Sequence, residues 1–301
     1  MSQPDPRPVV VAVGDQPADA ALSYAVAEAE RLGCGVHLVH VVHSLPQGSE
    51  LVRVQSVDVE DRGRHTLRRA LDLARELAGD GPRVTASLLI GTVVHELVTA
   101  VEQIGDVRMV VVQHRDLSRV RRLVSRSTTG GLAARLRLPL VSVPASWTAG
   151  IAPAVGGVDR VVTAGVDEPE RSVEVLRAAV AAARTHGARL DLVHAWGVPG
   201  LYDDPQLAEE VGKELAEAGA GEIRAQLDGL GVDFDDLHIE VHTPPQPAAE
   251  QLVEASRTAH LLVLGKHDPW FPLGSHVGPV TGAVLRDAQC PVLLVDPHPS
   301  D

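Results

Sequence analysis

The stretch PVVVAV (Pro8–Val13) decides the fold, because a near copy, RVVTAGV (Arg160–Val166), opens the second half of the chain. Three further blocks recur in the same order. HLVHVV (37–42) matches DLVHAW (191–196), MVVVQ (109–113) matches LLVLG (261–265), and LPLVSVP (138–144) matches CPVLLVD (290–296). His40 matches His194 and Gln113 matches Gly265, at offsets of 154 and 152 residues. Four blocks at one near-constant offset indicate an internal duplication.

Short apolar runs alternate with long Ala-rich segments of helical pattern in both halves. The runs predict strands at 9–13, 37–42, 84–90, 108–112 and 140–143, and again at 160–164, 189–195, 237–241, 260–264 and 291–295. The helical patterns cover 17–32, 58–79, 93–104 and 126–137, and then 169–186, 206–230, 246–258 and 279–288. Polar segments at 43–57 and 197–205 predict surface loops, and the Gly/Pro-rich segment 149–157 predicts a linker.

This alternation predicts an α/β fold in each half. Apolar runs without polar alternation are typical of strands that are buried on both faces, and strand–helix alternation implies a parallel sheet with right-handed crossovers. We therefore expect two five-stranded Rossmann-like domains, residues 1–148 and 158–301, each with strand order 3-2-1-4-5 and helices on both faces.

Composition excludes several classes of function. The net charge of −13 disfavours binding to nucleic acid or to anionic membranes, and an aromatic content of 2% leaves few side chains to stack on bases. Cys34 and Cys290 form neither a disulfide framework nor a CxxC metal pair. The first nine residues lack the apolar region of a signal peptide, and no apolar run reaches the roughly 18 residues of a membrane span. A cytoplasmic protein is expected.

A ligand site is expected where the strand order reverses. In open parallel sheets ligands bind beyond the carboxyl ends of the strands at this point, here between the first and fourth strands of each half. The loops that meet there are 14–17 and 113–127 in the first half, and 167–169 and 265–278 in the second. Glycines after the fourth strand let backbone amides approach phosphates, and the next helix offers its positive N-terminus.

With these loops, the chain resembles a tandem universal stress protein of the actinobacterial type. The resemblance covers both halves, nearly the whole chain. The family's nucleotide motif is G-x2-G-x9-G-[S/T] after strand four, with an Asp at the end of strand one. The second half has Gly265-x2-Asp268-x9-Gly278-Pro279 and ends strand one with Asp167. Two glycines and the Asp match. Proline removes one amide from the phosphate cradle, although it suits the first turn of a helix.

The first half departs further from the motif. It has Gln113-x2-Asp116-x9-Arg126-Ser127, of which only the serine matches, and Gly14 stands at the position of the Asp. The resemblance thus implies a degenerate motif in the first domain and a partial one in the second.

The resemblance implies an adenine nucleotide alpha hydrolase-like fold and a regulatory protein whose C-terminal half binds ATP with Mg²⁺ as its charge partner during a stress response. Val166 and Asp167 would hold adenine and ribose. The phosphates would be held by Gly265, Lys266, Gly278 and the amides of Val280 and Thr281. Adenine nucleotide and a second copy of the chain, as a homodimer, are the expected partners.

Other interpretations of individual residues stay open. Asp167 suits a helix cap, and the glycines suit ordinary turns. Trp196 suits either the wall of a base pocket or packing under the 197–205 loop. His267, His276 and Trp270-Phe271 suit ligand contact or a loop surface. A basic loop suits an anion clamp or a solvated face: Arg115, Arg119, Arg121, Arg122 and Arg126.

Catalysis and metal binding are not expected from the sequence. It contains no GxxxxGK[ST], GxSxG or HExxH motif and no recognisable triad, although slow ATP hydrolysis stays open. His37 and His43 share one face of a strand and His40 points to the other, which favours core or strand-end roles over zinc ligation. The alternative function is a nucleotide-independent interaction module that dimerises through its apolar fifth strand, 292–295.

Overall fold

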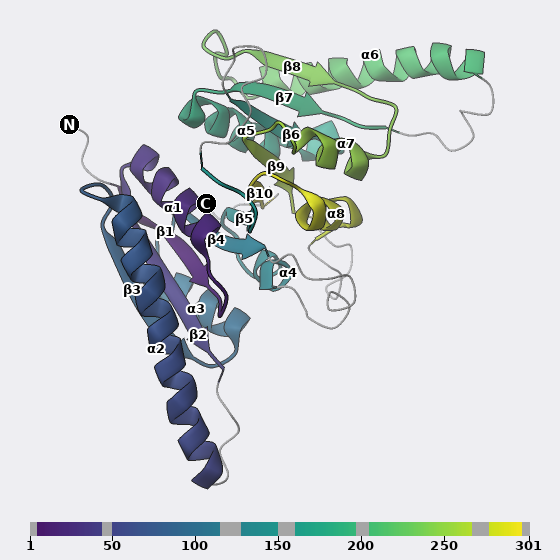
Figure 1. Ribbon diagram of the computed structural model, residues 1–301. Coiled ribbons are helices and arrows are strands. Elements are labelled where there is room, and N and C mark those ends of the chain that lie inside the picture. The colour runs from purple at the N-terminus through teal and green to yellow at the C-terminus, as the bar shows by residue number, and fades with distance from the viewer. Residues whose placement is uncertain are drawn as a thin grey trace. The chain divides into compact units, whose positions relative to one another are not determined.

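The computed structural model describes residues 5–43, 50–114, 128–149, 160–196, 205–266 and 277–296. Side chains are described from residue 7 in the first strand, from 58 in the second helix and from 211 in the sixth. The chain divides into two compact units, one up to Ala149 and one from Gly150 onward (Figure 1).

The N-terminal unit contains one five-stranded parallel sheet with the order β3-β2-β1-β4-β5. Its strands are β1 (Asp5–Val13), β2 (Cys34–Val42), β3 (Val84–Ile90), β4 (Met109–His114) and β5 (Leu140–Pro144). Its helices are α1 (Asp19–Leu32), α2 (Glu50–Ala78), α3 (Val93–Ile104) and α4 (Thr128–Ala133).

The C-terminal unit repeats this topology with the parallel order β8-β7-β6-β9-β10. Its strands are β6 (Val161–Gly165), β7 (Arg189–Val193), β8 (Ile239–His242), β9 (Leu261–Gly265) and β10 (Val292–Val295). Its helices are α5 (Val173–His186), α6 (Pro205–Gly229), α7 (Ala248–Ala255) and α8 (Pro279–Asp287). The predicted order 3-2-1-4-5 is confirmed in both halves.

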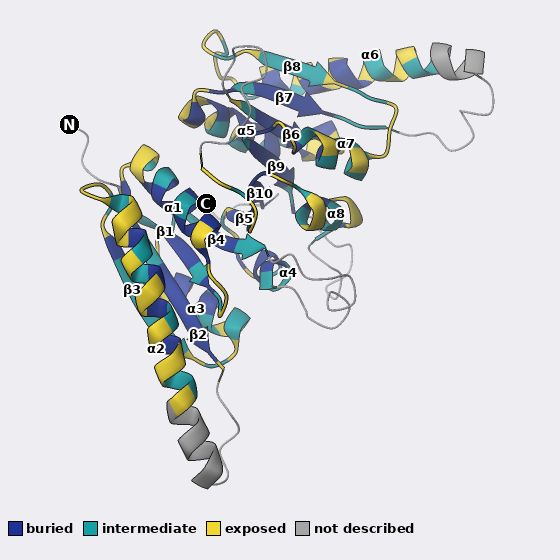
Figure 2. Ribbon diagram, in the orientation of Figure 1, coloured by how far each residue is buried: buried dark blue, intermediate teal, exposed yellow. Residues whose placement is uncertain are grey.

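The helices of each unit pack as two pairs. In the N-terminal unit α1 packs on α2, and α3 packs on α4; in the C-terminal unit the pairs are α5 with α6 and α7 with α8. The central strands of both sheets are buried (Figure 2). Val9, Val10 and Val11 of β1 and Leu262 and Val263 of β9 have no exposed surface. Burial of each such side chain stabilises the fold by about 1.5–3 kcal/mol, so the aliphatic strands form the core despite the scarcity of aromatic residues.

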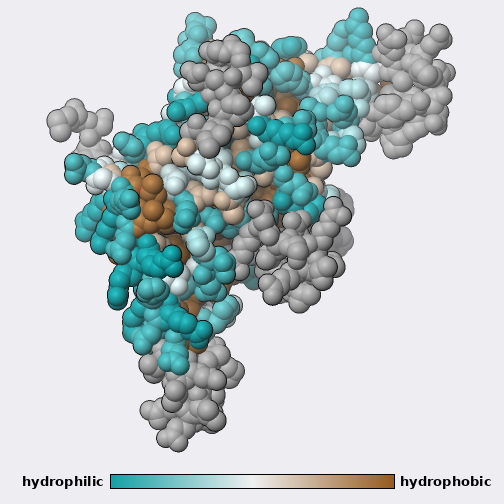
Figure 3. Space-filling model, viewed as in Figure 1, coloured by the Kyte–Doolittle hydropathy of each residue, from teal (hydrophilic) through white to brown (hydrophobic). Residues whose placement is uncertain are grey.

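Three predicted helix boundaries differ from the structure by four residues or more. Helix α2 begins at Glu50, so residues 50–57 continue the helix and are not part of the expected loop. The described outward side of α2 is largely charged and hydrophilic (Figure 3), whereas residues 50–57 contain three valines and no alanine, unlike the Ala-rich pattern that predicted the helices. Helix α4 ends at Ala133, four residues before the predicted end at 137.

The third boundary concerns the segment after β6. A 3-10 helix at Pro169–Arg171 precedes α5, and Ser172 separates the two. Of the second expected loop, only Pro205 lies within the described residues, and it begins α6. Among the described residues no helix is both long and apolar enough to cross a membrane.

Candidate functional site

The point of strand reversal in the C-terminal unit lies between β6 and β9. These strands pair in parallel register, with Val162 opposite Leu261 and Ala164 opposite Val263. The chain leaves β6 toward β7 on one side of the sheet and leaves β9 toward β10 on the other. Asp167, two residues after β6, and Lys266, directly after β9, therefore lie at one edge of the sheet, where the topology predicts a ligand site.

Asp167 is exposed, and its carboxylate makes no hydrogen bond with another described residue. It does not cap a helix. Glu168 precedes the 3-10 helix, and Ser172 precedes α5 and donates its hydroxyl hydrogen bond to the Glu168 carbonyl at 2.8 Å. The capping interpretation of Asp167 was therefore wrong, and the carboxylate is open to a ligand.

The backbone of Val166 is already bonded. Its N–H donates to the Val193 carbonyl at 2.9 Å, and its carbonyl lies 3.0 Å from Nδ1 of His194. The same arrangement occurs in the N-terminal unit, where Nδ1 of His40 lies 2.8 Å from the Val13 carbonyl. The strand-end role expected for His40 is confirmed. Val166 has only its buried side chain to offer as an apolar contact.

The N-terminus of α8 presents two amides. Gly278 is the N-cap residue, Pro279 is the first helical residue, and Gly282 is the first whose N–H bonds back, to the Gly278 carbonyl at 2.8 Å. The N–H groups of Val280 and Thr281 precede it and have no acceptor within the helix. The Thr281 hydroxyl donates to the Gly265 carbonyl at 3.4 Å, so the first turn of α8 lies against the end of β9. Two amides and the positive end of a helix dipole suit an anion.

The ammonium of Lys266 is buried and paired with a carboxylate. Its side chain is 2% exposed, and Nζ lies 3.4 Å from Oδ2 of Asp296. Its N–H donates to the Val295 carbonyl at 2.8 Å. Sequence reasoning missed Asp296. The signal was the register: Gly265 pairs with Val295, so the residues that follow are neighbours across β9 and β10.

The same point in the N-terminal unit holds a side chain. Gln113 stands at the position of Gly265, and its Nε2 donates to the Pro17 carbonyl at 2.8 Å while its Oε1 accepts from the Ala21 N–H at 3.2 Å. The side chain thus joins the end of β4 to the loop after β1 and to the first turn of α1. Gly265 has no such side chain, and a Cβ placed there would lie 3.2 Å from Cγ2 of Val175 in α5.

Trp196 packs within the C-terminal unit. Its indole N–H donates to the Thr243 carbonyl at 3.0 Å, and its ring faces Gly212 of α6, where an added Cβ would lie 3.2 Å from the ring. The remaining candidates lie outside the described residues, namely Asp116, Ser127, His267, Asp268, Trp270, Phe271, His276 and the basic loop Arg115, Arg119, Arg121, Arg122 and Arg126.

Comparison with known proteins agrees with the duplicated fold. The Universal stress protein family matches twice, at residues 6–144 and 160–296. Universal stress protein Rv1996 of Mycobacterium tuberculosis is 25% identical over 308 residues, which cover 95% of this chain and 94% of that protein. The crystal structure of a universal stress protein from Archaeoglobus fulgidus DSM 4304 covers 95% of this chain and 96% of its own, with a TM-score of 0.65 and 15% identity.

Shorter proteins of the same name have been solved with nucleotides. One universal stress protein is in complex with cAMP, and another, from Archaeoglobus fulgidus, is in complex with dAMP; each covers 45% of this chain at 19% identity, with TM-scores of 0.36 and 0.33. Because the family matches both units and nearly the whole chain, the protein belongs to the Universal stress protein family and contains two tandem domains of it.

Proposed function

We propose that the C-terminal unit binds an adenine nucleotide, ATP with Mg²⁺, at the carboxyl ends of β6 and β9. One observation carries the proposal: Gly265 has no side chain at the end of β9, where the side chain of Gln113 bridges the equivalent point in the N-terminal unit. A polyphosphate must approach the main chain closely, which a glycine permits and a hydrogen-bonded glutamine prevents.

The surrounding residues supply the contacts that such a ligand needs. The open carboxylate of Asp167 accepts hydrogen bonds from ribose hydroxyls, and buried Val166 offers an apolar contact to the base. The amides of Val280 and Thr281, next to Gly278, donate to phosphate oxygens at the positive end of α8. Lys266 has no part in this assignment because its ammonium is paired with Asp296.

Charge explains why Mg²⁺ belongs to the proposal. The chain carries a formal charge of −13, which opposes the approach of a free polyphosphate. A bound Mg²⁺ neutralises part of the phosphate charge and keeps most of its water, so it needs no dedicated protein ligands. Binding without turnover is enough for regulation, because a ligand shifts a conformational equilibrium by its difference in affinity for two states.

The test is isothermal titration of the full chain with ATP and Mg²⁺. We expect one site, which Asp167→Ala weakens and Gly265→Gln abolishes. Asp15→Ala is the matched control, since Asp15 is an exposed carboxylate after β1 of the other unit. Absence of heat at millimolar ATP, or equal affinity after Asp167→Ala, contradicts the proposal.

The alternative of a nucleotide-independent interaction module that dimerises through its apolar fifth strand, 292–295, stays open. Homodimerisation and a cytoplasmic location stay predictions. Light scattering with and without ATP tests the former.

A further inference from the structure

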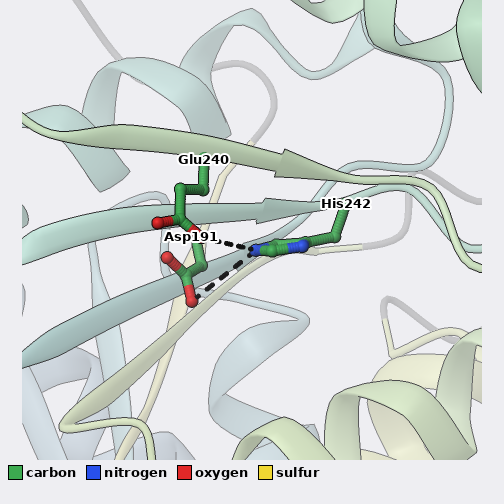
Figure 4. Close-up of side chains that lie close together, drawn as sticks. All are labelled: Asp191, Glu240 and His242. Carbon is green, nitrogen blue, oxygen red and sulfur yellow. Dashed lines mark ion pairs between the residues drawn. The ribbon is translucent and has the colours of Figure 1, made fainter. Parts of the chain in front are cut away.

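Three metal-ligating side chains converge on β7 and β8, away from the point of strand reversal. Asp191 lies opposite Glu240 in the parallel register, and His242 lies two residues further along β8, so all three point to one face of the sheet (Figure 4). One ligand atom from each lies within 4.8 Å of the other two.

The separations are too long for hydrogen bonds and suit a shared ion. Nε2 of His242 lies 3.5 Å from Oε2 of Glu240 and 3.8 Å from Oδ2 of Asp191 (Figure 4). Hydrogen bonds from nitrogen to oxygen usually span about 2.7–3.2 Å. Two ligands bound tetrahedrally to zinc at about 2.0–2.1 Å stand roughly 3.3–3.4 Å apart. A small side-chain adjustment therefore closes the set around one ion.

Asp191 carries a second, independent indication. The residue is 9% exposed, and its Oδ1 is buried with no hydrogen-bond partner among the described residues. Its other oxygen, Oδ2, is paired with Nη2 of Arg189 at 3.1 Å. A buried carboxylate oxygen without a partner is unfavourable, so an ion bound by this carboxylate would satisfy Oδ1, while Oδ2, the oxygen 3.8 Å from His242, stays paired with Arg189.

A hydrogen bond with His238 orients the carboxylate of Glu240. Nε2 of His238 lies 2.9 Å from Oε1 of Glu240, which leaves Oε2 directed at His242. Metal sites commonly orient their ligands through an outer hydrogen bond of this kind.

The cluster is reachable from solvent. The neighbouring side chains of β7, Leu190 and Leu192, point to the opposite face and are fully buried, and His194 on that face lies against Gly219 of α6. The cluster thus lies on the face away from α6. The side chain of His242 is 45% exposed, so an ion can reach it without disruption of the core.

The N-terminal unit has a closed, uncharged version of the same arrangement. His37 stands at the position of Asp191, and its two ring nitrogens lie 2.8 Å from Oγ1 of Thr85 and 2.9 Å from Oγ of Ser87. Thr85 and Ser87 occupy on β3 the positions that Glu240 and His242 occupy on β8. The same sheet position therefore accommodates threonine and serine in place of Glu240 and His242.

We propose that Asp191, Glu240 and His242 bind a divalent transition-metal ion of the zinc class, with water in the remaining coordination positions. An imidazole with carboxylates is a ligand set that zinc accepts, and three protein ligands leave one position open. Arg189 reduces the net charge of the two carboxylates to −1, so the affinity should fall below that of a four-ligand structural zinc site. The site is separate from the proposed nucleotide site.

The experiment is titration of the metal-free full chain with Zn²⁺, without nucleotide, by calorimetry. We expect one saturable equivalent. The variant Glu240→Thr/His242→Ser copies the residues of the N-terminal unit and should remove that equivalent while the protein stays folded by circular dichroism. Loss of the outer partner in His238→Ala should weaken binding by about 10–100-fold. His65→Gln, at an exposed position of α2, is the control and should change nothing.

A second readout separates this site from adventitious binding by other histidines. Co²⁺ bound by an imidazole and two carboxylates should give a visible absorption band that Asp191→Asn removes. An unchanged Zn²⁺ equivalent in Glu240→Thr/His242→Ser overturns the proposal, because the ion then binds elsewhere. Failure of the wild-type chain to bind Zn²⁺ below millimolar concentration overturns it as well.

Discussion

Replacement of Gln113 by alanine should loosen the start of α1 in the N-terminal unit. The helix begins after Ala18, whose side chain gives no capping hydrogen bond. The side-chain oxygen Oε1 of Gln113 accepts a hydrogen bond from the Ala21 N–H at 3.2 Å and so caps the helix from the end of β4. The side-chain Nε2 donates to the Pro17 carbonyl at 2.8 Å. The variant removes both bonds and leaves the helix end to water.

The magnitude follows from two hydrogen bonds. Each contributes about 0.5–1.5 kcal/mol to stability, so the local free energy of opening should fall by about 1–3 kcal/mol. Each 1.4 kcal/mol changes an equilibrium tenfold, so hydrogen exchange at the Ala21 amide should accelerate by about 5–150-fold.

Hydrogen exchange followed by NMR measures this effect at single amides, which matters in a chain of two domains where global unfolding need not be two-state. Amides in the middle of α5, in the other unit, serve as the internal control and should not change. Unaltered exchange at Ala21 in Gln113→Ala would refute the capping role, and with it our explanation of why this position differs between the units.

Three further predictions concern the cores. Burial lowers the pKa of His37, so at acidic pH the unfolded chain binds a proton more readily than the folded unit does. The stability that neutral His37 contributes is therefore present above about pH 6.5 and is lost as the pH falls. His37→Gln should flatten this decline when the free energy of unfolding is measured in urea at several pH values. Burial raises the pKa of the Cys290 thiol to about 12, so iodoacetamide at pH 8 should modify it only when the chain unfolds, and rapid labelling of native protein would count against this. Leu38→Ala and Leu192→Ala, at matched fully buried positions, should each destabilise their own unit by about 2–5 kcal/mol, and equal loss in both units from either change would show that the units do not unfold independently.

The sheets could be predicted because their central strands are buried on both faces. Val9–Val11 and Leu261–Leu264 are apolar without alternation, and this pattern together with the 152–154-residue offset defines two parallel sheets before any coordinate is known. The start of α2 at Glu50 could not be predicted in the same way, because residues 50–57 contain three β-branched valines and no alanine, unlike the Ala-rich pattern of the other helices.

The site was harder to predict because its chemistry depends on register. Lys266 was expected to hold phosphate, but pairing with Asp296 follows only from the alignment of β9 with β10. Part of the metal-ligating cluster can be recognised in the sequence, where His238, Glu240 and His242 occupy alternate positions. Asp191 joins them only through the pairing of β7 with β8.

The central claim is that one unit binds nucleotide and the other does not, because Gly265 and Gln113 occupy equivalent points. Calorimetric titration of Gly265→Gln with ATP and Mg²⁺, beside the wild-type chain, tests it most directly. We predict one binding equivalent in the wild type and none in the variant. Wild-type binding that survives Gly265→Gln undiminished would contradict the claim.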